Sequence, residues 1–286
     1  MTKLNEKAML VHLTVHQWMG RVKDIGASEE LAVQKNASSE AGTTVLISLA
    51  PKRLVNPIDN AGWAARLEHQ RLTLPWMDKG HRILPANMFM KYTECIRAKV
   101  AVFQARVNEF LEAYPELMEA AELKQRMGDL GKGVIIPSVD ELRAHFSIVT
   151  DVLPLPNADD FRVSIGEEEA AHIKADIEKN IGEKMREAQN DLWKRLTELV
   201  SKVHERLSNA DNKFRDSLME NLKDFCSLIP NLNIVDDPNL ETMRSELMEK
   251  LTKEWKPDDM RNDKIARAKA AKDAKEVLDK MKDFFV

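Results

Sequence analysis

The sequence predicts a mainly α protein, in which a long antiparallel helical stalk carries a small strand-containing (α+β) head and a C-terminal helical bundle. Two observations on composition indicate this class: glycine (10) and proline (11) are scarce among 286 residues, and 31% of the residues are charged while 43% are hydrophobic. The third observation is periodicity, since two long stretches repeat apolar residues every three or four positions. The predicted parts are the head with the first long helix (residues 1–165, helix at 86–125), the second long helix (166–210) and the C-terminal helical region (211–286).

The first elements of the head are predicted from short patterns. Residues 9–19 alternate apolar and polar side chains, which predicts a half-buried strand. Ser28, followed by two glutamates, predicts the N-cap of a short helix. Residues 43–57 are apolar and partly β-branched, which fits a strand or a helix, and a helix is expected over 58–72, after Pro57.

The segment RLTLPWMDKGHRILP, residues 71–85, is the densest cluster of polar and aromatic side chains. Asp78, Lys79 and Gly80 have the composition of a tight turn between two apolar flanks. If the turn needs a positive φ at Gly80, any residue with a Cβ would be strained there. We therefore interpret the segment as structural, with the turn formed by Trp76, Asp78, Gly80 and His81.

An enzyme would need side chains that the fold brings together, and the best candidates lie in the same segment. Asp78 and His81 would act as an acid and base pair, with Arg82 and either Asp159 or Asp160 nearby. No second carboxylate, glycine-rich cradle or nucleophile motif accompanies them in the segment. The sequence therefore favours a protein that is not an enzyme, with no catalytic residue, cofactor or metal assigned.

Two long helices are predicted from apolar seams, one within Pro85–Tyr114 and one within Gly166–Leu207. Helices of such length usually pack along another long helix, so we expect these two to form an antiparallel pair. The steps of the second seam are mostly four residues, so its helix should run nearly straight. The first seam consists of Phe89, Tyr92, Ile96, Val100, Phe103, Val107, Phe110 and Tyr114, and the second of Ala170, Ile173, Ile177, Ile181, Met185, Ala188, Leu192, Leu196, Leu199, Val203 and Leu207.

The stretch between these helices predicts a short helix and two strands. Ser138 and Glu141 have the spacing of a capping box. Residues 146–156 alternate enough to predict a strand, and Arg162–Ile165 predict a short edge strand. Because a lone strand would leave its backbone groups unpaired, we expect these strands to pair with the N-terminal one.

Three helices are predicted in the C-terminal region. The first ends before Pro230, and the second begins at Asp237 and Pro238, residue types that are typical of a helix start, and ends before Pro257. The third runs over residues 262–286. We expect a small bundle that folds back on the chain or swaps onto a neighbouring copy.

This region also holds two candidate contact sites. A basic run on the last helix has cations near one face and is a candidate nucleic-acid interface, although acidic side chains three or four residues away offer internal pairing instead. The apolar end, Phe284, Phe285 and Val286, is the candidate partner or oligomer contact, because such residues dock into the chain's own core or into a partner. The candidate nucleic-acid contacts are Arg261, Lys264, Arg267, Lys272 and Lys275, with Trp255 as a stacking residue.

Charge, cysteine content and hydropathy narrow the function classes. The formal net charge of -4 gives no bulk attraction to nucleic acid or an anionic membrane, and no run of about 18 apolar residues spans a bilayer. Cys95 and Cys226 are expected to be buried thiols in a reducing cytoplasm. His12 and His16 share a strand face beyond easy reach of one metal ion, and Lys132 lacks the serine or threonine of a phosphate loop.

The chain resembles an uncharacterised family encoded mainly by bacteriophages and prophages, some members of which lie near MoxR-type AAA+ ATPases. The resemblance covers roughly residues 9–207. It implies a phage protein in the bacterial host cytoplasm, leaves open an ATP-driven partner, and transfers no catalytic residues. It is carried by the strand ending in Trp18, Met19 and Gly20, by LAPKRLVNP (49–57), TLPWMDKGHRILP (73–85) and PSVDELRAHFSIVTDVLPLP (137–156), and by DDFRV (159–163).

The sequence thus leads to three hypotheses on function. The first is a non-enzymatic, phage-type interaction or scaffold protein that forms a homo-oligomer, or docks to a phage or host protein, through helical surfaces. The second is a nucleic-acid-binding accessory protein of DNA replication or recombination that uses the C-terminal basic helix. The third is an adaptor of a AAA+ ATPase.

Overall fold

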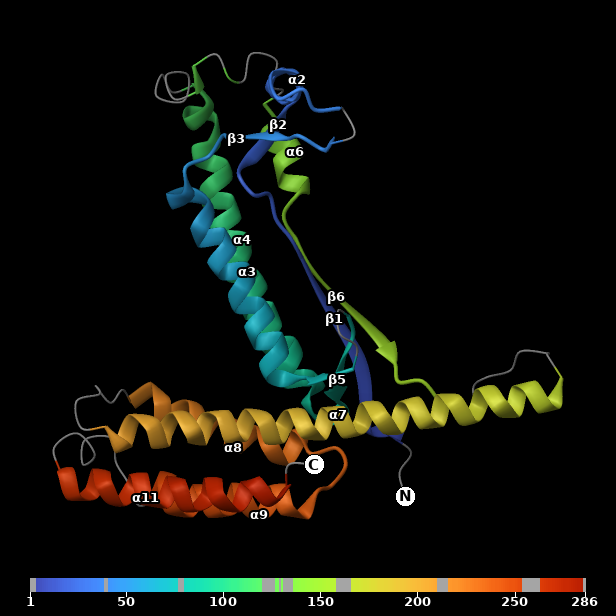
Figure 1. Ribbon diagram of the computed structural model, residues 1–286, viewed down its shortest axis with the longest axis vertical. Coiled ribbons are helices and arrows are strands. Elements are labelled where there is room, and N and C mark those ends of the chain that lie inside the picture. The colour runs from blue at the N-terminus through green and yellow to red at the C-terminus, as the bar shows by residue number, and fades with distance from the viewer. Residues whose placement is uncertain are drawn as a thin grey trace. The chain divides into compact units, whose positions relative to one another are not determined.

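The computed structural model is mainly helical with a small strand-containing part, which confirms the predicted class (Figure 1). It describes residues 4–38, 41–76, 80–119, 127–128, 130, 136–157, 166–209, 216–253 and 263–284. The strands are β1 (Ala8–His16), β2 (Arg21–Asp24), β3 (Val45–Ser48), β4 (Leu74–Pro75), β5 (Arg82–Pro85) and β6 (Ser147–Pro154). The helices are α1 (Leu4–Lys7), α2 (Ile25–Gln34), α3 (Lys52–Leu72), η2 (Ala86–Met88), α4 (Phe89–Glu119), α6 (Val139–Ala144), α7 (Glu167–Ser208), α8 (Asp216–Leu232), α9 (Pro238–Leu247), η4 (Met248–Lys253), α11 (Lys264–Met281) and η5 (Lys282–Phe284).

Contacts divide the chain into two units, each built from segments that are far apart in the sequence. Unit 1 comprises Met1–His12, Gln70–Met90 and Asp151–Val286, and unit 2 comprises Leu13–His69 and Lys91–Thr150. The predicted parts follow one another along the chain, whereas the observed units are interleaved. The reason is that the chain leaves unit 1 early in β1 and returns to it twice.

The segment 71–85 forms the predicted hairpin. β4 pairs antiparallel with β5, with Leu74 opposite Ile83, and β5 pairs antiparallel with β1 over Ala8–Val11. Trp76 is only 4% exposed and Ile83 is fully buried, so both flanks of the turn are apolar core, as predicted. In the sheet order β4-β5-β1-β6, the strand predicted at 146–156 lies beside the N-terminal strand, which confirms the expected pairing.

Gly80 is the part of the Asp78–Gly80 turn that the structure describes. The residues with positive φ among those described do not include Gly80, and a Cβ built there would meet no atom within 4 Å. Asp78 and Lys79 lie outside the described residues.

A second, two-stranded sheet forms in unit 2, where β2 pairs antiparallel with β3. This settles the undecided stretch 43–57 as a strand followed by a helix start. The N-cap of α2 is Asp24, whose side chain accepts from the amide of Ala27. Ser28, the predicted cap, is instead buried within the helix and accepts a 2.9 Å hydrogen bond from the amide of Val45 in β3.

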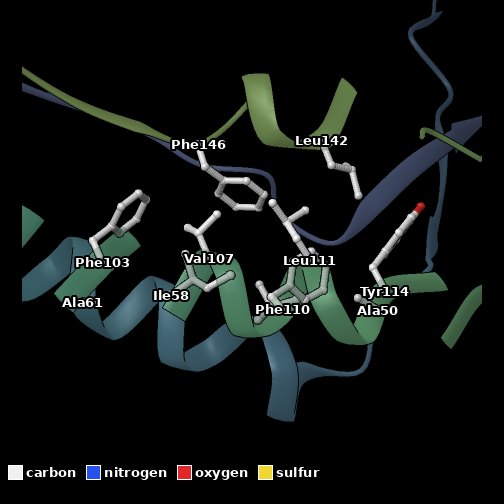
Figure 2. Close-up of a cluster of buried hydrophobic side chains, with 11 residues drawn as sticks. Ala50, Ile58, Ala61, Phe103, Val107, Phe110, Leu111, Tyr114, Leu142 and Phe146 are labelled. Atoms are coloured by element: carbon white, nitrogen blue, oxygen red, sulfur yellow. The ribbon is translucent and has the colours of Figure 1, made fainter. Parts of the chain in front are cut away.

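The core of unit 2 lies between α3, α4 and α6 (Figure 2). The predicted seam of α4 supplies most of it, because Phe103, Val107, Phe110 and Tyr114 are each at most 2% exposed. Figure 2 shows Leu142 of α6 and Phe146, just after it, facing this row from the other side. The capping box of Ser138 and Glu141 starts α6 as predicted. The other buried members of the cluster are Ala50, Val55, Ile58, Ala61 and Leu111.

Helix α3 begins at Lys52, before the predicted start, and contains Pro57. Proline removes one backbone hydrogen bond, but the early start places Val55 in the buried cluster of unit 2. Gly62 allows the helix to lie close to the segment after β1. A Cβ at Gly62 would come within 2.8 Å of the Gln17 side-chain oxygen and 3.1 Å of a Val15 methyl carbon, so a larger residue would require these side chains to shift.

The helical part of unit 1 is built on α7, which contacts α11 and α8. Figure 1 shows these two helices beside the C-terminal half of α7. The seam of α4 is covered by α3 and α6, and the C-terminal half of the seam of α7, from Met185 onward, is covered by α8 and α11. The expected pairing of the two long helices with each other stays a prediction, because α4 lies in unit 2 and α7 in unit 1, and each packs against amphipathic helices of its own unit.

Of two helix boundaries predicted in the C-terminal region, one is confirmed and the other differs. Asp237 is the N-cap of α9 and Pro238 is its first residue, as predicted. In contrast, α8 does not end before Pro230 but continues to Leu232. Leu232 is fully buried, and its burial offsets the hydrogen bond that the proline cannot donate. The predicted edge strand Arg162–Ile165 lies outside the described residues.

Candidate functional site: the surface of helix α7

One buried carboxylate organises the middle of α7. Asp237, at the start of α9, accepts hydrogen bonds at one oxygen from the amides of Asn239 (2.9 Å) and Leu240 (3.4 Å). Its other oxygen accepts from the Gln189 side-chain amide at 2.7 Å and from the Trp193 indole at 3.0 Å. The N-cap of one helix is thereby joined to the side of another.

These contacts decide the chemistry of Asp237. Burial alone would raise the pKa of the Asp237 carboxyl, but the hydrogen bonds from Gln189, Trp193 and the two amides outweigh burial and lower the pKa below its usual value. A carboxylate that is ionised and already accepts four hydrogen bonds is a poor general base. Asp237 is therefore a structural group that fixes α9 on α7.

Besides the hydrogen bond at its ring edge, Trp193 has one ring face covered by the chain's own C-terminal segment. Phe284 stacks on Trp193 with ring centroids 5.2 Å apart and an angle of 14° between the rings. Of the predicted partner contacts, Phe284 thus docks on its own chain, while Phe285 and Val286 lie outside the described residues. In the single chain, α8, α9 and α11 pack on one another and on α7, and the choice between folding back and swapping onto a neighbouring copy stays open.

A cavity of about 610 Å³ lies beside this aromatic pair. Its lining mixes side chains of both charges and amides with the rings of Trp193 and Phe284. Charged lining residues come from the turn of α7 that precedes Trp193, so the cavity extends the surface of α7. The lining residues are Glu183, Arg186, Glu187, Gln189, Asn190, Trp193, Asp237, Asn239 and Phe284.

The N-terminal half of α7 differs sharply from the half that carries Trp193. The buried residues of α7 begin at Met185, and all positions of the seam before it are only half-buried. At 1.5 Å per residue, the 42 residues of α7 span roughly 63 Å, whereas α8 and α11 have 17 and 18 residues. Neither helix is long enough to cover the whole seam. The half-buried seam residues are Ala170, Ile173, Ile177 and Ile181.

The turn region also holds Arg82, which the sequence analysis placed in the alternative active site. Arg82 donates to the Thr73 hydroxyl at 2.7 Å and to the Thr73 carbonyl at 3.2 Å. Arg195 of α7 donates to the same carbonyl at 3.1 Å and pairs with Asp191 at 2.6 Å. Burial, with the neighbouring charge of Arg195, lowers the pKa of Arg82 to about 10 although Asp191 opposes the shift. Arg82 is thus part of the contact between hairpin and helix.

The other members of the alternative active site are only partly described. The ring of His81, just before β5, lies beside the ring of His12 in β1, with centroids 5.3 Å apart. Asp78, Asp159 and Asp160 lie outside the described residues. The described ring neighbour of His81 is therefore His12, and the predicted pair of Asp78 and His81 stays a prediction.

The candidate nucleic-acid interface on α11 is partly used for internal contacts. Arg267 donates to the carbonyl oxygens of Arg206 (2.6 Å) and Leu207 (3.1 Å) at the end of α7. Lys272 lies 3.9 Å from Glu276, the internal pairing considered from the sequence. Lys264 and Lys275 also belong to α11, while Arg261 and Trp255 lie outside the described residues.

Metal and thiol chemistry find no support in the described ranges. Among these residues, no three histidine, cysteine, aspartate or glutamate side chains are grouped to hold a metal ion. Neither Cys95 nor Cys226 forms a disulfide; Cys95 is half-buried, and burial raises the pKa of the Cys226 thiol to about 12. A thiol with such a pKa is not a nucleophile near neutral pH. No helix in the described part of the chain is long and apolar enough to cross a membrane.

The comparisons with known proteins add no identity: no family model, no curated protein and no solved structure matched the chain. The phage family resemblance therefore stays a prediction. Sequence reasoning missed the contacts of Trp193 and Arg195, which lie beside the seam of α7 rather than on it. The sequence does hold a signal for the contact of Trp193. A buried tryptophan needs an acceptor for its indole N–H, and the aspartate of an Asp-Pro helix start is such an acceptor.

Proposed function

We propose that this chain is a non-enzymatic interaction protein that binds protein partners through the surface of α7. The observation that carries the proposal is the unequal cover of that helix. Its C-terminal half is buried from Met185 onward, while Ile173, Ile177 and Ile181 remain half-buried. Isoleucines at i, i+4 spacing on a helix longer than its partners are typical of a helix that packs against another protein.

The neighbouring cavity supports the same proposal. It continues from Glu183 to Trp193 along the next turns of α7, and its lining offers amides and charges of both signs. An apolar stripe beside a polar cavity resembles the core and rim of a protein interface. A phage or host protein, including a AAA+ ATPase, would be a partner of this kind.

Photo-crosslinking tests the proposal. A photoreactive phenylalanine analogue is placed at Ile177 on the stripe or, as a matched control, at Ala175 on the opposite face of the helix, and the chain is irradiated in the cells that express it. We expect an adduct of defined mass and identity from position 177 and none from position 175. Equal or absent adducts at both positions would contradict the proposal.

A second candidate function, nucleic-acid binding, rests on the basic side chains of α11 that remain after Arg267 has bonded to α7. Binding through Lys264, Lys272 and Lys275 would weaken steeply with salt, because each phosphate contact releases counterions. Fluorescence anisotropy with single- and double-stranded DNA at about 50 mM salt tests it. No binding under these conditions removes the candidate.

A further inference from the structure

We infer that the N-terminal half of α7 binds the same segment of a second copy of this chain in antiparallel orientation. The inference rests on the proposed function, since it names the partner of the surface proposed there. The first argument is the spacing of the stripe. Ile173, Ile177 and Ile181 lie four residues apart, so the stripe is symmetric about Ile177.

An antiparallel pair of helices related by a two-fold axis at Ile177 makes this stripe self-complementary. Ile177 then meets the partner's Ile177, and Ile173 meets the partner's Ile181 in both directions. At 100° per residue the three side chains fall within about 80° of one another, which is the width of a helix seam. A two-fold contact of this kind closes on itself and yields a dimer rather than a fibre.

The charges beside the stripe fit the antiparallel orientation. When the two-fold axis passes through Ile177, Lys174 is offset from the partner's Glu178 by about two residues, or roughly 3 Å along the helix. Lys184 is offset from the partner's Glu169 by about one residue, or roughly 1.5 Å along the helix. Each pair occurs twice by symmetry. In the single chain Lys184 is paired with Glu187 at 2.8 Å, so it would be shared between the two carboxylates.

The parallel orientation has charge conflicts. Lys184 lies about 20° from the centre of the stripe, so parallel helices in register would place it against the partner's Lys184. Residues 167–176 carry four acidic side chains and one lysine, whereas residues 177–186 carry two acidic and three basic side chains. Parallel pairing brings the two acidic segments together, and antiparallel pairing brings each against the more basic one.

The size of the contact sets the expected strength. Residues 167–184 span roughly 27 Å of helix, with an apolar stripe one side chain wide. Such a contact falls at the small end of specific interfaces, where association is weak and transient. We therefore expect a dimer that forms at tens to hundreds of micromolar and dissociates on dilution, in roughly the range where small interfaces bind.

Sedimentation velocity over a concentration series measures the dimer. Ile177→Glu places two carboxylates on the axis and should raise the dimer dissociation constant at least about tenfold, as buried like charges do. Ala175→Glu introduces the same residue on the opposite face and should leave the constant unchanged. Far-UV circular dichroism and thermal melts on both variants establish that each is folded. A chain that stays monomeric at several hundred micromolar, or equal weakening by both variants, overturns the inference.

Cysteine cross-linking measures the orientation. With a bis-maleimide of about 10 Å reach, Glu178→Cys should cross-link two copies, since it lies next to the axis. Glu169→Cys should not, because antiparallel copies hold these positions roughly 24 Å apart. The wild-type chain, with Cys95 and Cys226, is the control. Efficient cross-linking of Glu169→Cys indicates a parallel dimer and overturns the orientation.

Failure of the inference is distinguishable from failure of the proposed function. A monomeric chain whose position 177 still gives an adduct with a different, identified protein contradicts the second-copy partner and leaves the proposed function standing. A monomeric chain without such an adduct contradicts both.

Discussion

The two halves of α7 have the same apolar sequence pattern but differ in how far the apolar side chains are buried. From Met185 to Leu207 the seam is buried except at Leu199, which is half-buried while the neighbouring Val200 is buried; Leu196 and Val203 are fully inaccessible. From Ala170 to Ile181 the seam is half-buried. The side chains do not explain the difference, because isoleucine is as apolar as leucine. The difference follows from the lengths of α8 and α11, which cover part of a 42-residue helix. Periodicity thus tells which face is apolar, and only the partners tell how much of it is core.

The largest expected effect is the contrast between two truncations on this one seam. Leu196→Ala removes a fully buried side chain and should lower the free energy of unfolding by about 2–5 kcal/mol. Ile177→Ala should lower it by less than about 1 kcal/mol in dilute solution, as changes outside the core do. Urea unfolding of both variants measures the contrast. Equal losses would show that the N-terminal half is covered as well as the C-terminal half.

A substitution of Trp193 measures how much its hydrogen bond to Asp237 stabilises the buried half of α7. Trp193→Phe keeps the ring that stacks on Phe284 but removes the indole N–H that donates to Asp237. Because the lost hydrogen bond goes to a charged group, we expect a loss of about 1–3 kcal/mol in unfolding free energy. Gln189→Leu, which removes the other side-chain donor to the same oxygen, is the matched comparison. A neutral Trp193→Phe would mean that this hydrogen bond contributes little.

Phe284 should matter less. The ring is half-buried, and its stacking on Trp193 is worth about 0.5–1.5 kcal/mol by analogy with other aromatic pairs. Phe284→Leu keeps the apolar volume and should recover part of the loss caused by Phe284→Ala. Thermal melts of the two variants rank them. If Phe284→Ala weakened dimer formation without changing the melting temperature, the ring would belong to an interface rather than to the fold.

The smallest effect near neutral pH is the acid response of Asp237. Its pKa is lowered in the folded chain, so its contribution to stability is complete above the pKa of the unfolded chain, about 3.9 for aspartate, and is lost as the pH falls through the lower folded value. Asp237→Asn should therefore flatten the dependence of unfolding free energy on pH below about 4. Urea unfolding at pH 3 to 7 measures the slope. An unchanged acid slope would locate the acid sensitivity in other carboxylates.

The sequence predicted the elements better than their neighbours. The strand at β1, the hairpin at 71–85, the capping box at Ser138 and the Asp-Pro start of α9 were all recognised, because each is encoded by residues a few positions apart. The partner of α4 was not recognised. An apolar seam accepts any amphipathic helix, and α3 supplies one from the other side of the hairpin, a choice that depends on contacts between distant residues.

The site was predicted less well for a related reason. Phe284 was identified as a residue that must dock somewhere, but its stacking partner Trp193 lies about 90 residues away and shares no local pattern with it. The same holds for Arg195, whose carbonyl partner at Thr73 precedes it by 122 residues. Ser28 shows that local patterns also leave choices open. Both Asp24 and Ser28 are suitable N-cap residues, and the helix is capped at Asp24, four residues before the predicted cap.

The contact of Arg267 with the end of α7 affects the order in which the chain can fold. The last carbonyls of a helix have no partners within it, and here a guanidinium 60 residues further along supplies them with donors. During synthesis, α7 emerges well before α11, so its final turn would stay frayed until residues 264–281 have left the ribosome. Amide hydrogen exchange at the end of α7 would then report the docking of α11 rather than the stability of α7 alone.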